Sequence, residues 1–233
     1  MKQLTIIFAT GVILFFGSCS GSGSEEKKTD STTAATPAAP VFQPFNIAVI
    51  THPVKDFDKW KTAYFAHDSV RKAYGISHLS FGRGLEDSDM VTVVQLISDV
   101  QKAKEFSMLP SLKVLMQKAG VTGPPTFDFI HVLRDDTTAT DNNDRMMIAH
   151  KVKDFDAWLK VFDNEGSAKR AGYGMVDKAL GRGIDDSTMV YLLFTVTDLA
   201  KAKERGNSDE LKKIMTDAGV VGPPKVRFFK VVK

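Results

Sequence analysis

The sequence predicts an α+β protein in which two copies of a β-α-β-β-α-β unit pack together as one intramolecular, pseudo-dimeric barrel. Three observations predict this architecture. Motifs recur in the same order in both halves, each half alternates strand-length apolar runs with capped amphipathic helices, and the third strand of each half is apolar almost throughout. The repeat carries the most weight, because self-similarity at a fixed spacing decides an architecture before local propensity does.

The two copies span 45–134 and 144–233. They are joined by the polar linker 135–143, which reads "DDTTATDNN". The stretch "HPVKDFDKW" at 52–60 returns as "HKVKDFDAW" at 150–158. The motifs "GRG", "KAKE" and "AGV" followed by "GPP" also recur in the same order. A duplication explains this agreement.

Each unit begins with a short apolar run, "NIAVITHPV" or "RMMIAHKV", that has the length of a strand. Asp56 and Asp154 are good N-caps for the helix that follows. Its apolar residues recur on one face: Phe57, Trp60 and Tyr64 in the first copy, and Phe155, Trp158 and Phe162 in the second. We expect this helix to end near Gly75 and Gly174, where the spacing between the copies also changes by a single residue.

A hairpin comes next, since "HLSFGRG" and "KALGRG" lead through an acidic turn into "MVTVVQLIS" and "MVYLLFTVT". Asp99 and Asp198 then cap a second helix, on which "KAKE" indicates a solvated face. Pro110 interrupts this helix in the first copy, and Ser208 starts a new helix in the second. The last strand follows "GPP" as "TFDFIHVL" or "KVRFFKVV".

This order of elements is the ferredoxin-like split βαβ pattern. The apolar third strands imply that both faces of each sheet are covered. Two helices cover only one face, and a unit of about ninety residues is marginal when the other face stays wet. The adjacent copy is therefore the expected partner.

In their sequence motifs, the units resemble the dimeric α+β-barrel superfamily, which includes antibiotic-biosynthesis-monooxygenase-like and stress-responsive proteins. The likeness rests on "VKDFDxW", on "GRG" with its acidic turn and on "GPP", and it extends over both copies. It implies that two ferredoxin-like units pair sheet to sheet and that a ligand lies between the helices and the sheet. It implies little about activity, because one fold supports many functions.

The N-terminus predicts export and a lipid anchor. Lys2 precedes an apolar run from Leu4 to Phe16, which as a helix would span about 20 Å and so is too short for a bilayer core of about 30 Å. Residues 1–18 are thus expected to be a signal peptide. The stretch "FFGSCSGSGS" resembles the lipobox of bacterial lipoproteins, which makes Cys19 the expected site of lipidation and the bacterial membrane a partner. Residues 19–44 would then be a flexible tether in the cell envelope.

Composition excludes some partners. The net charge of +3 comes from interleaved lysines and acids without a basic stripe, so we expect no nucleic-acid partner. One histidine per copy, without a second ligand at metal-binding spacing, is a poor metal site. We expect neither a metal nor a cofactor.

His52 and His150 are the candidate catalytic residues, since a neutral imidazole can act as a general base. The alternative is a structural role, in which each hydrogen-bonds the loop that enters the helix. Trp60 and Trp158 are either core residues or the wall of a ligand pocket.

Arg83 and Arg182, in "GRG", are candidate carboxylate-binding residues at the sheet edge. The alternative is that they pair with the neighbouring acids, while the glycines make room for a large side chain. The acids in question are Glu86, Asp87, Asp185 and Asp186.

Three functions follow from these expectations. The first is a module that binds a small, partly apolar ligand between sheet and helices. The second is a cofactor-independent oxygenase or isomerase with His52 or His150 as proton acceptor. The third is an envelope interaction protein whose barrel is only a scaffold. A space beneath the first helix that is closed and well filled would exclude the first two.

Overall fold

The computed structural model describes residues 42–232. The predicted signal peptide, Cys19 and nearly all of the predicted tether lie outside the described residues. Within the described part of the chain, no helix is long and apolar enough to cross a membrane.

Each repeat contains four strands and four short helices. The first has β1 (Phe45–Pro53), α1 (Phe57–Ala66), α2 (Asp68–Ala73), β2 (Ile76–Gly84), β3 (Met90–Ile97), α3 (Val100–Ser107), α4 (Pro110–Lys118) and β4 (Thr126–Asp135). The second has β5 (Asp144–Val152), α5 (Phe155–Glu165), α6 (Ser167–Gly172), β6 (Met175–Gly183), β7 (Met189–Val196), α7 (Leu199–Asn207), α8 (Asp209–Asp217) and β8 (Val220–Val232).

Helix starts follow the predicted caps. The Asp56 carboxylate accepts a hydrogen bond from the backbone N–H of Lys59 at 3.0 Å, and the Asp154 carboxylate accepts one from Ala157 at 2.8 Å. Pro110 begins α4, and Ser208 caps α8, as expected.

The first helix of each repeat is broken, although one continuous helix was predicted. In the second repeat the break falls at Gly166, whose φ of 80° cannot continue a right-handed helix. Arg71 and Arg170 lie over the rings of Tyr64 and Phe162 in the same way. The extra residue of the second repeat therefore falls at this break rather than near Gly174.

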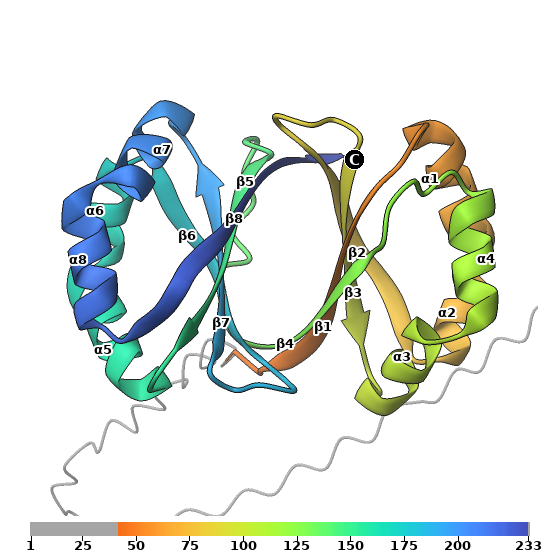
Figure 1. Cartoon of the computed structure of the whole chain (residues 1–233), viewed down its shortest axis with the longest axis horizontal. Coiled ribbons are helices and arrows are strands. Elements are labelled where there is room, and N and C mark those ends of the chain that lie inside the picture. The colour runs from red at the N-terminus through yellow and green to blue at the C-terminus, as the bar shows by residue number, and fades with distance from the viewer. Residues whose placement is uncertain (1–41, 233) are drawn as a thin grey trace, which may run out of the picture. The chain divides into compact units, whose positions relative to one another are not determined.

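The eight strands form one closed antiparallel barrel in the order β1-β3-β2-β8-β5-β7-β6-β4. Two pairings join the repeats, β2 with β8 and β4 with β6. Figure 1 shows the barrel strands in the middle and the helices of the two repeats on opposite outer sides. The predicted pseudo-dimeric barrel is confirmed.

The inner and outer faces of the barrel bury different residues. Val49, Met147, Phe229 and their neighbours form one cluster inside the barrel, to which both repeats contribute. Each helical layer covers a separate core on the outer face of its own sheet. Both faces of the sheet are thus covered, and β3 and β7 are buried along most of their length, as their apolar sequences predicted.

The glycines of "GRG" lie at the joints between the repeats. A Cβ atom on Gly82 would be 2.5 Å from Cδ2 of Phe229, and one on Gly181 would be 2.6 Å from Cγ2 of Ile130. The glycines therefore make room for a large side chain from the other repeat. Only a residue without a side chain lets the joining strand approach this closely.

Ion pairs repeat at the two joints. Lys104 of α3 pairs with Asp185 in the turn of the second repeat, and Lys203 of α7 pairs with Glu86 in the turn of the first. Both lysines belong to "KAKE", so the helix face that was predicted to be solvated also makes ion pairs across the joints. In each copy, the second lysine of this motif thus contacts the acidic turn between the second and third strands of the other repeat.

Candidate functional site

A buried histidine ends the first strand of each repeat. His52 is 2% exposed and His150 is 5% exposed. Strand alternation points both toward the helices, on the same face as Ile50 and Ile148, as predicted. Neither ring nitrogen of either histidine has a hydrogen-bond partner among the described protein groups. Neither histidine therefore makes the hydrogen bond to the loop entering the helix that a structural role would require.

Burial also sets the charge state of these histidines. Desolvation lowers the pKa of His52 to about 4 and the pKa of His150 to about 4. Each imidazole is therefore neutral at physiological pH, with one N–H donor and one nitrogen acceptor. Such a group favours a hydrogen-bonding ligand over a proton transfer, because a base this weak takes up few protons near pH 7.

The histidine begins a column of stacked groups that both repeats share. In the first repeat, the centroids of His52 and Trp60 are 5.5 Å apart, and those of Trp60 and Tyr64 are 5.3 Å apart. The guanidinium carbon of Arg71 then lies 3.7 Å from the centre of the Tyr64 ring. Trp60 and Tyr64 align because residues four apart share one face of α1.

The second repeat builds the same column from different residues. His150 and Trp158 are 5.3 Å apart, Trp158 and Phe162 are 5.3 Å apart, and Arg170 lies 3.7 Å from the Phe162 ring. We call each set of four, His52-Trp60-Tyr64-Arg71 and His150-Trp158-Phe162-Arg170, a ring column.

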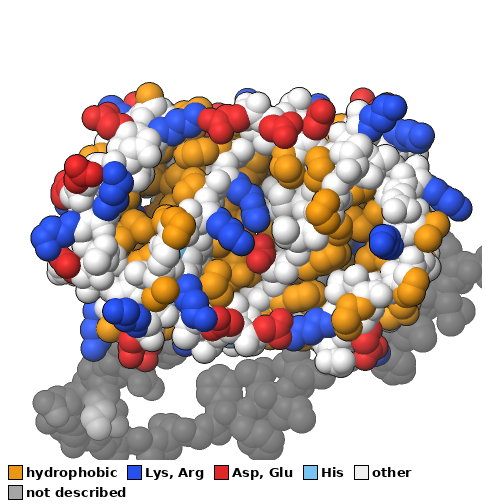
Figure 2. Space-filling model, in the orientation of Figure 1, with side chains coloured by type: hydrophobic (Ala, Val, Ile, Leu, Met, Phe, Trp, Pro, Cys, Tyr) orange, Lys and Arg blue, Asp and Glu red, His pale blue; other side chains and the backbone are white. Residues whose placement is uncertain are grey.

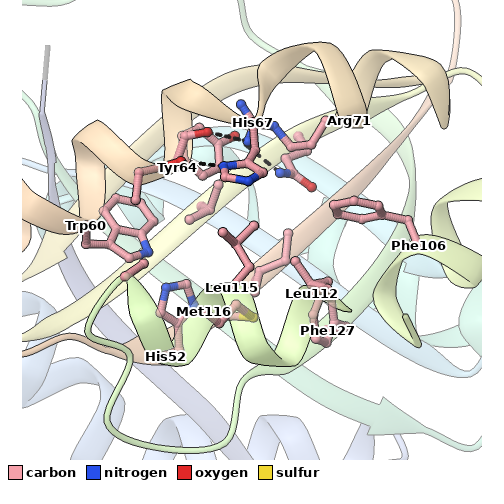
Figure 3. A pocket seen from close by; sticks show the side chains of 15 residues that line it. His52, Trp60, Tyr64, His67, Arg71, Phe106, Leu112, Leu115, Met116 and Phe127 are labelled. Atoms are coloured by element: carbon pink, nitrogen blue, oxygen red, sulfur yellow. Dashed lines mark hydrogen bonds between the residues drawn. The ribbon is translucent and has the colours of Figure 1, made fainter. Parts of the chain in front are cut away.

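Each ring column forms one wall of a cavity between the sheet and the helices. The cavity of the first repeat has a volume of about 70 Å³, and the corresponding cavity of the second has a volume of about 270 Å³. Helix α4 supplies the opposite wall in the first repeat, with Leu112, Leu115 and Met116, as Figure 3 shows. In the second repeat α8 supplies Leu211, Ile214 and Met215.

The tryptophans therefore belong to both predicted settings. Trp60 is 3% exposed and Trp158 is 5% exposed, so both are packed in the helical cores. Both also line a cavity. On the face drawn in Figure 2, hydrophobic side chains gather between the central strands and the helices of each half, whereas most charged side chains lie at the rim and a few lie over the central strands.

The two cavities differ at the arginine end of the column. Arg170 donates from Nε and Nη2 to the Asp177 carboxylate at 2.8 and 2.5 Å, and from Nη1 to the Phe162 carbonyl at 2.7 Å. Glu165 lies 3.6 Å from the same guanidinium and 2.8 Å from Arg205. Every nitrogen of Arg170 is thus engaged, and nearby carboxylates balance its charge.

Arg71 has fewer partners. It donates to the Tyr64 carbonyl at 2.5 Å and to Asp68 at 3.2 Å, while its buried Nε has no hydrogen-bond partner among the described groups. His78 stands where the second repeat has Asp177, and its Nδ1 is 3.2 Å from the Tyr64 hydroxyl. The first repeat therefore lacks the carboxylate that holds Arg170.

Sequence reasoning missed these two arginines. Arginine is rarely buried, and the motif comparison drew attention only to the arginines of "GRG". Their recurrence just before the tyrosine and glycine of "AYG" and "GYG" was the available signal.

Arg83 and Arg182 line neither cavity. Arg83 donates to the Ser88 carbonyl at 2.8 Å and lies over the Phe57 ring, and Arg182 does the same with Ser187 at 2.9 Å and Phe155. Their predicted pairing with the neighbouring acids was wrong, because these carbonyl and ring contacts hold each guanidinium. A ligand at this sheet edge stays a prediction.

The inside of the barrel holds a polar cluster that differs between the copies. The Tyr191 hydroxyl donates to Asp128 at 3.1 Å, and Arg227 lies 3.7 Å from the other oxygen of that carboxylate. Burial and the adjacent Asp128 charge raise the pKa of Tyr191. Among residues 42–232, no three His, Cys, Asp or Glu side chains are grouped closely enough to hold a metal ion.

Comparison with known proteins identifies the fold. No protein-family model matches the sequence, and no curated protein matches it. An anthrone oxidase-like protein matches 81% of this chain and 92% of its own length, with 12% identity and a TM-score of 0.53. A presumed monooxygenase from Fusobacterium nucleatum matches 82% of this chain and 93% of its own, with 16% identity and a TM-score of 0.51. A presumed chlorite dismutase matches 82% and 96%, with 9% identity and a TM-score of 0.51.

These similarities concern the fold alone, since the identities are low. The chain has the dimeric α+β-barrel fold with both halves in one polypeptide, as the resemblance of its motifs predicted.

Proposed function

We propose that this protein is a lipid-anchored protein of the bacterial cell envelope whose duplicated barrel binds small, partly apolar ligands beneath the helices of each repeat. One observation carries the binding function. A buried imidazole that has no hydrogen-bond partner within residues 42–232 lines an apolar cavity at the end of the same ring column in both repeats. An unpaired buried polar group is costly, so a hydrogen-bonding ligand that pairs with it gains affinity.

Tryptophan fluorescence tests this proposal directly. The chain has two tryptophans, and each lines one of the cavities. Protein purified from its native envelope should carry a small molecule that mass spectrometry detects under native conditions. Removing that molecule should change the emission of both tryptophans, and adding it back should restore the emission.

Paired variants assign the binding to the cavity. Leu211 lines the cavity of the second repeat, so Leu211→Phe should reduce the amount of bound ligand. Val221 lies on β8 outside the cavity and is 46% exposed, so Val221→Phe should leave it unchanged. Equal binding by the two variants would contradict the proposal.

The anchor rests on Cys19 and its lipobox-like surroundings. Attachment at this residue would hold the barrel at the periplasmic face of a membrane or at the cell surface, on a tether of about 25 residues. Cys19→Ser should release the protein from the membrane fraction and change its processing. Unchanged partition and processing would exclude lipidation.

An enzymatic function is the second candidate, favoured by the position of the histidines in the cavities and by the names of the structural relatives. A cofactor-independent oxygenase or isomerase would use His52 or His150 as proton acceptor. Replacing both with alanine should then abolish turnover of the bound molecule and leave the melting temperature nearly unchanged. Binding ranks first, because a pKa of about 4 suits a hydrogen bond better than a proton transfer. A scaffold without a ligand would carry no small molecule and would fail the first test.

A further inference from the structure

We propose that the two cavities select different ligands: the cavity of the first repeat binds a molecule with a carboxylate end, which Arg71 receives, and that of the second repeat binds an uncharged molecule. This inference rests on the proposed binding function. It adds the chemical class of ligand for each cavity.

The charge of Arg71 is only partly compensated within the protein. The residue is 3% exposed and lines the cavity, and its Nε has no hydrogen-bond partner among the described groups. Asp68, whose carboxylate lies 3.2 Å from Arg71, also pairs with Lys72 at 2.7 Å. A carboxylate on the ligand would supply the charge-assisted partner that this guanidinium lacks.

The second repeat shows what a compensated site looks like. Both carboxylate oxygens of Asp177 accept hydrogen bonds from Arg170, and Glu165 lies 3.6 Å from the same guanidinium. A further carboxylate brought by a ligand would find this guanidinium already paired. The change from Asp177 to His78 therefore converts a balanced arginine into one that can receive an anion.

The opening of the first cavity to the surface also suits a ligand with a carboxylate end. His67 and Phe106 line both the cavity and an adjoining surface hollow of about 330 Å³, which also contains the exposed Lys118. Figure 3 shows Arg71 and His67 toward one end of the cavity and His52 toward the other. The apolar body of the ligand would lie along the ring column, with its acid group near the mouth.

Phenylacetate and phenylacetamide are suitable probes, because they share one apolar body and differ in charge. The full-length protein with Trp158→Phe retains Trp60 as its only tryptophan, so its fluorescence reports the first cavity. The protein with Trp60→Phe reports the second. We expect the first cavity to bind phenylacetate at least tenfold more tightly than phenylacetamide, and the second cavity to show no preference for the acid.

Two substitutions assign the preference to the arginine end. His78→Asp installs the carboxylate of the second repeat and should remove the preference in the first cavity while phenylacetamide binding persists. Asp177→His should create a preference for the acid in the second cavity. Neither variant removes an arginine, so the test does not depend on a buried arginine being replaceable.

The outcomes separate this inference from the proposed function. If neither probe nor the native small molecule binds in either cavity, the binding function itself fails. If the probes bind but the first cavity does not prefer the acid, or if His78→Asp leaves that preference intact, only the assignment of a carboxylate ligand is overturned.

Discussion

Replacing His150 with leucine should remove a pH-dependent weakness of the fold. The imidazole is 5% exposed, and burial lowers its pKa from an ordinary value of 6.5 to about 4. Each tenfold change in acid dissociation corresponds to about 1.4 kcal/mol, so protonating the native state costs about 3 kcal/mol more than protonating the unfolded state. Leucine has a similar volume and no charge to bury.

The sign follows from which state binds the proton. Between pH 6.5 and pH 4 the unfolded chain is protonated at this residue while the folded chain is not, so stability falls as the pH falls. At pH 7 the substitution should change the free energy of unfolding by less than about 1.5 kcal/mol. At pH 5 the wild type should have lost about 2 kcal/mol that His150→Leu retains. For a body of this size that difference is about 4–8 °C in melting temperature.

Urea unfolding at pH 7 and pH 5 measures this difference. Ile148→Leu is the matched control, since Ile148 lies on the same strand and face and its replacement leaves His150 in place. This control should keep the pH dependence of the wild type. The reasoning is refuted if wild type and His150→Leu lose stability in parallel between the two pH values. A loss of several kcal/mol at pH 7 would instead assign the imidazole a structural hydrogen bond.

Two further predictions concern the joints and the inside of the barrel. Gly181→Ala should destabilise the fold by about 2 kcal/mol or more, because its Cβ would be 2.6 Å from Ile130 and 2.8 Å from a backbone oxygen. Gly172→Ala, where no atom lies within 4 Å, should be neutral or stabilising in the same thermal unfolding assay. For the pair Asp128 and Arg227, a double-mutant cycle of alanine substitutions should give a coupling of about 0.5–1 kcal/mol at low salt that shrinks at high salt. Zero coupling at low salt would show that the contact does not contribute to stability.

Much of the fold could be predicted because its signals are local. Asp56 and Asp154 cap helices through hydrogen bonds to residues three positions away, and the strand runs are short and apolar. The helix break at Gly166 was not predicted. Gly174 is also a glycine that can end a helix, and the sequence pattern does not show which of the two does so first. The helical period predicted which face of the helix Trp60 occupies.

The polar end of the site was harder to predict, because it depends on contacts between separate elements. The sequence does not reveal that Arg170 lies beside Asp177, since one belongs to α6 and the other to β6. The difference between Asp177 and His78 was visible in the sequence, but its meaning depends on the arginine that each faces. In the same way, "GRG" attracted attention for its arginine, whereas its first glycine is what lets the repeats join.

Asp128 and Arg227 occupy equivalent positions of the two repeats, three residues after each "GPP", and they contact each other. Two equivalent positions that touch lie on the pseudo-twofold axis of the barrel. In a dimer of identical chains this position would face its own copy, so a carboxylate would meet a carboxylate and a guanidinium would meet a guanidinium. Fusion into one polypeptide removes that restriction, and it allows residues on the axis to become complementary where a symmetric ancestor could only have matched like with like.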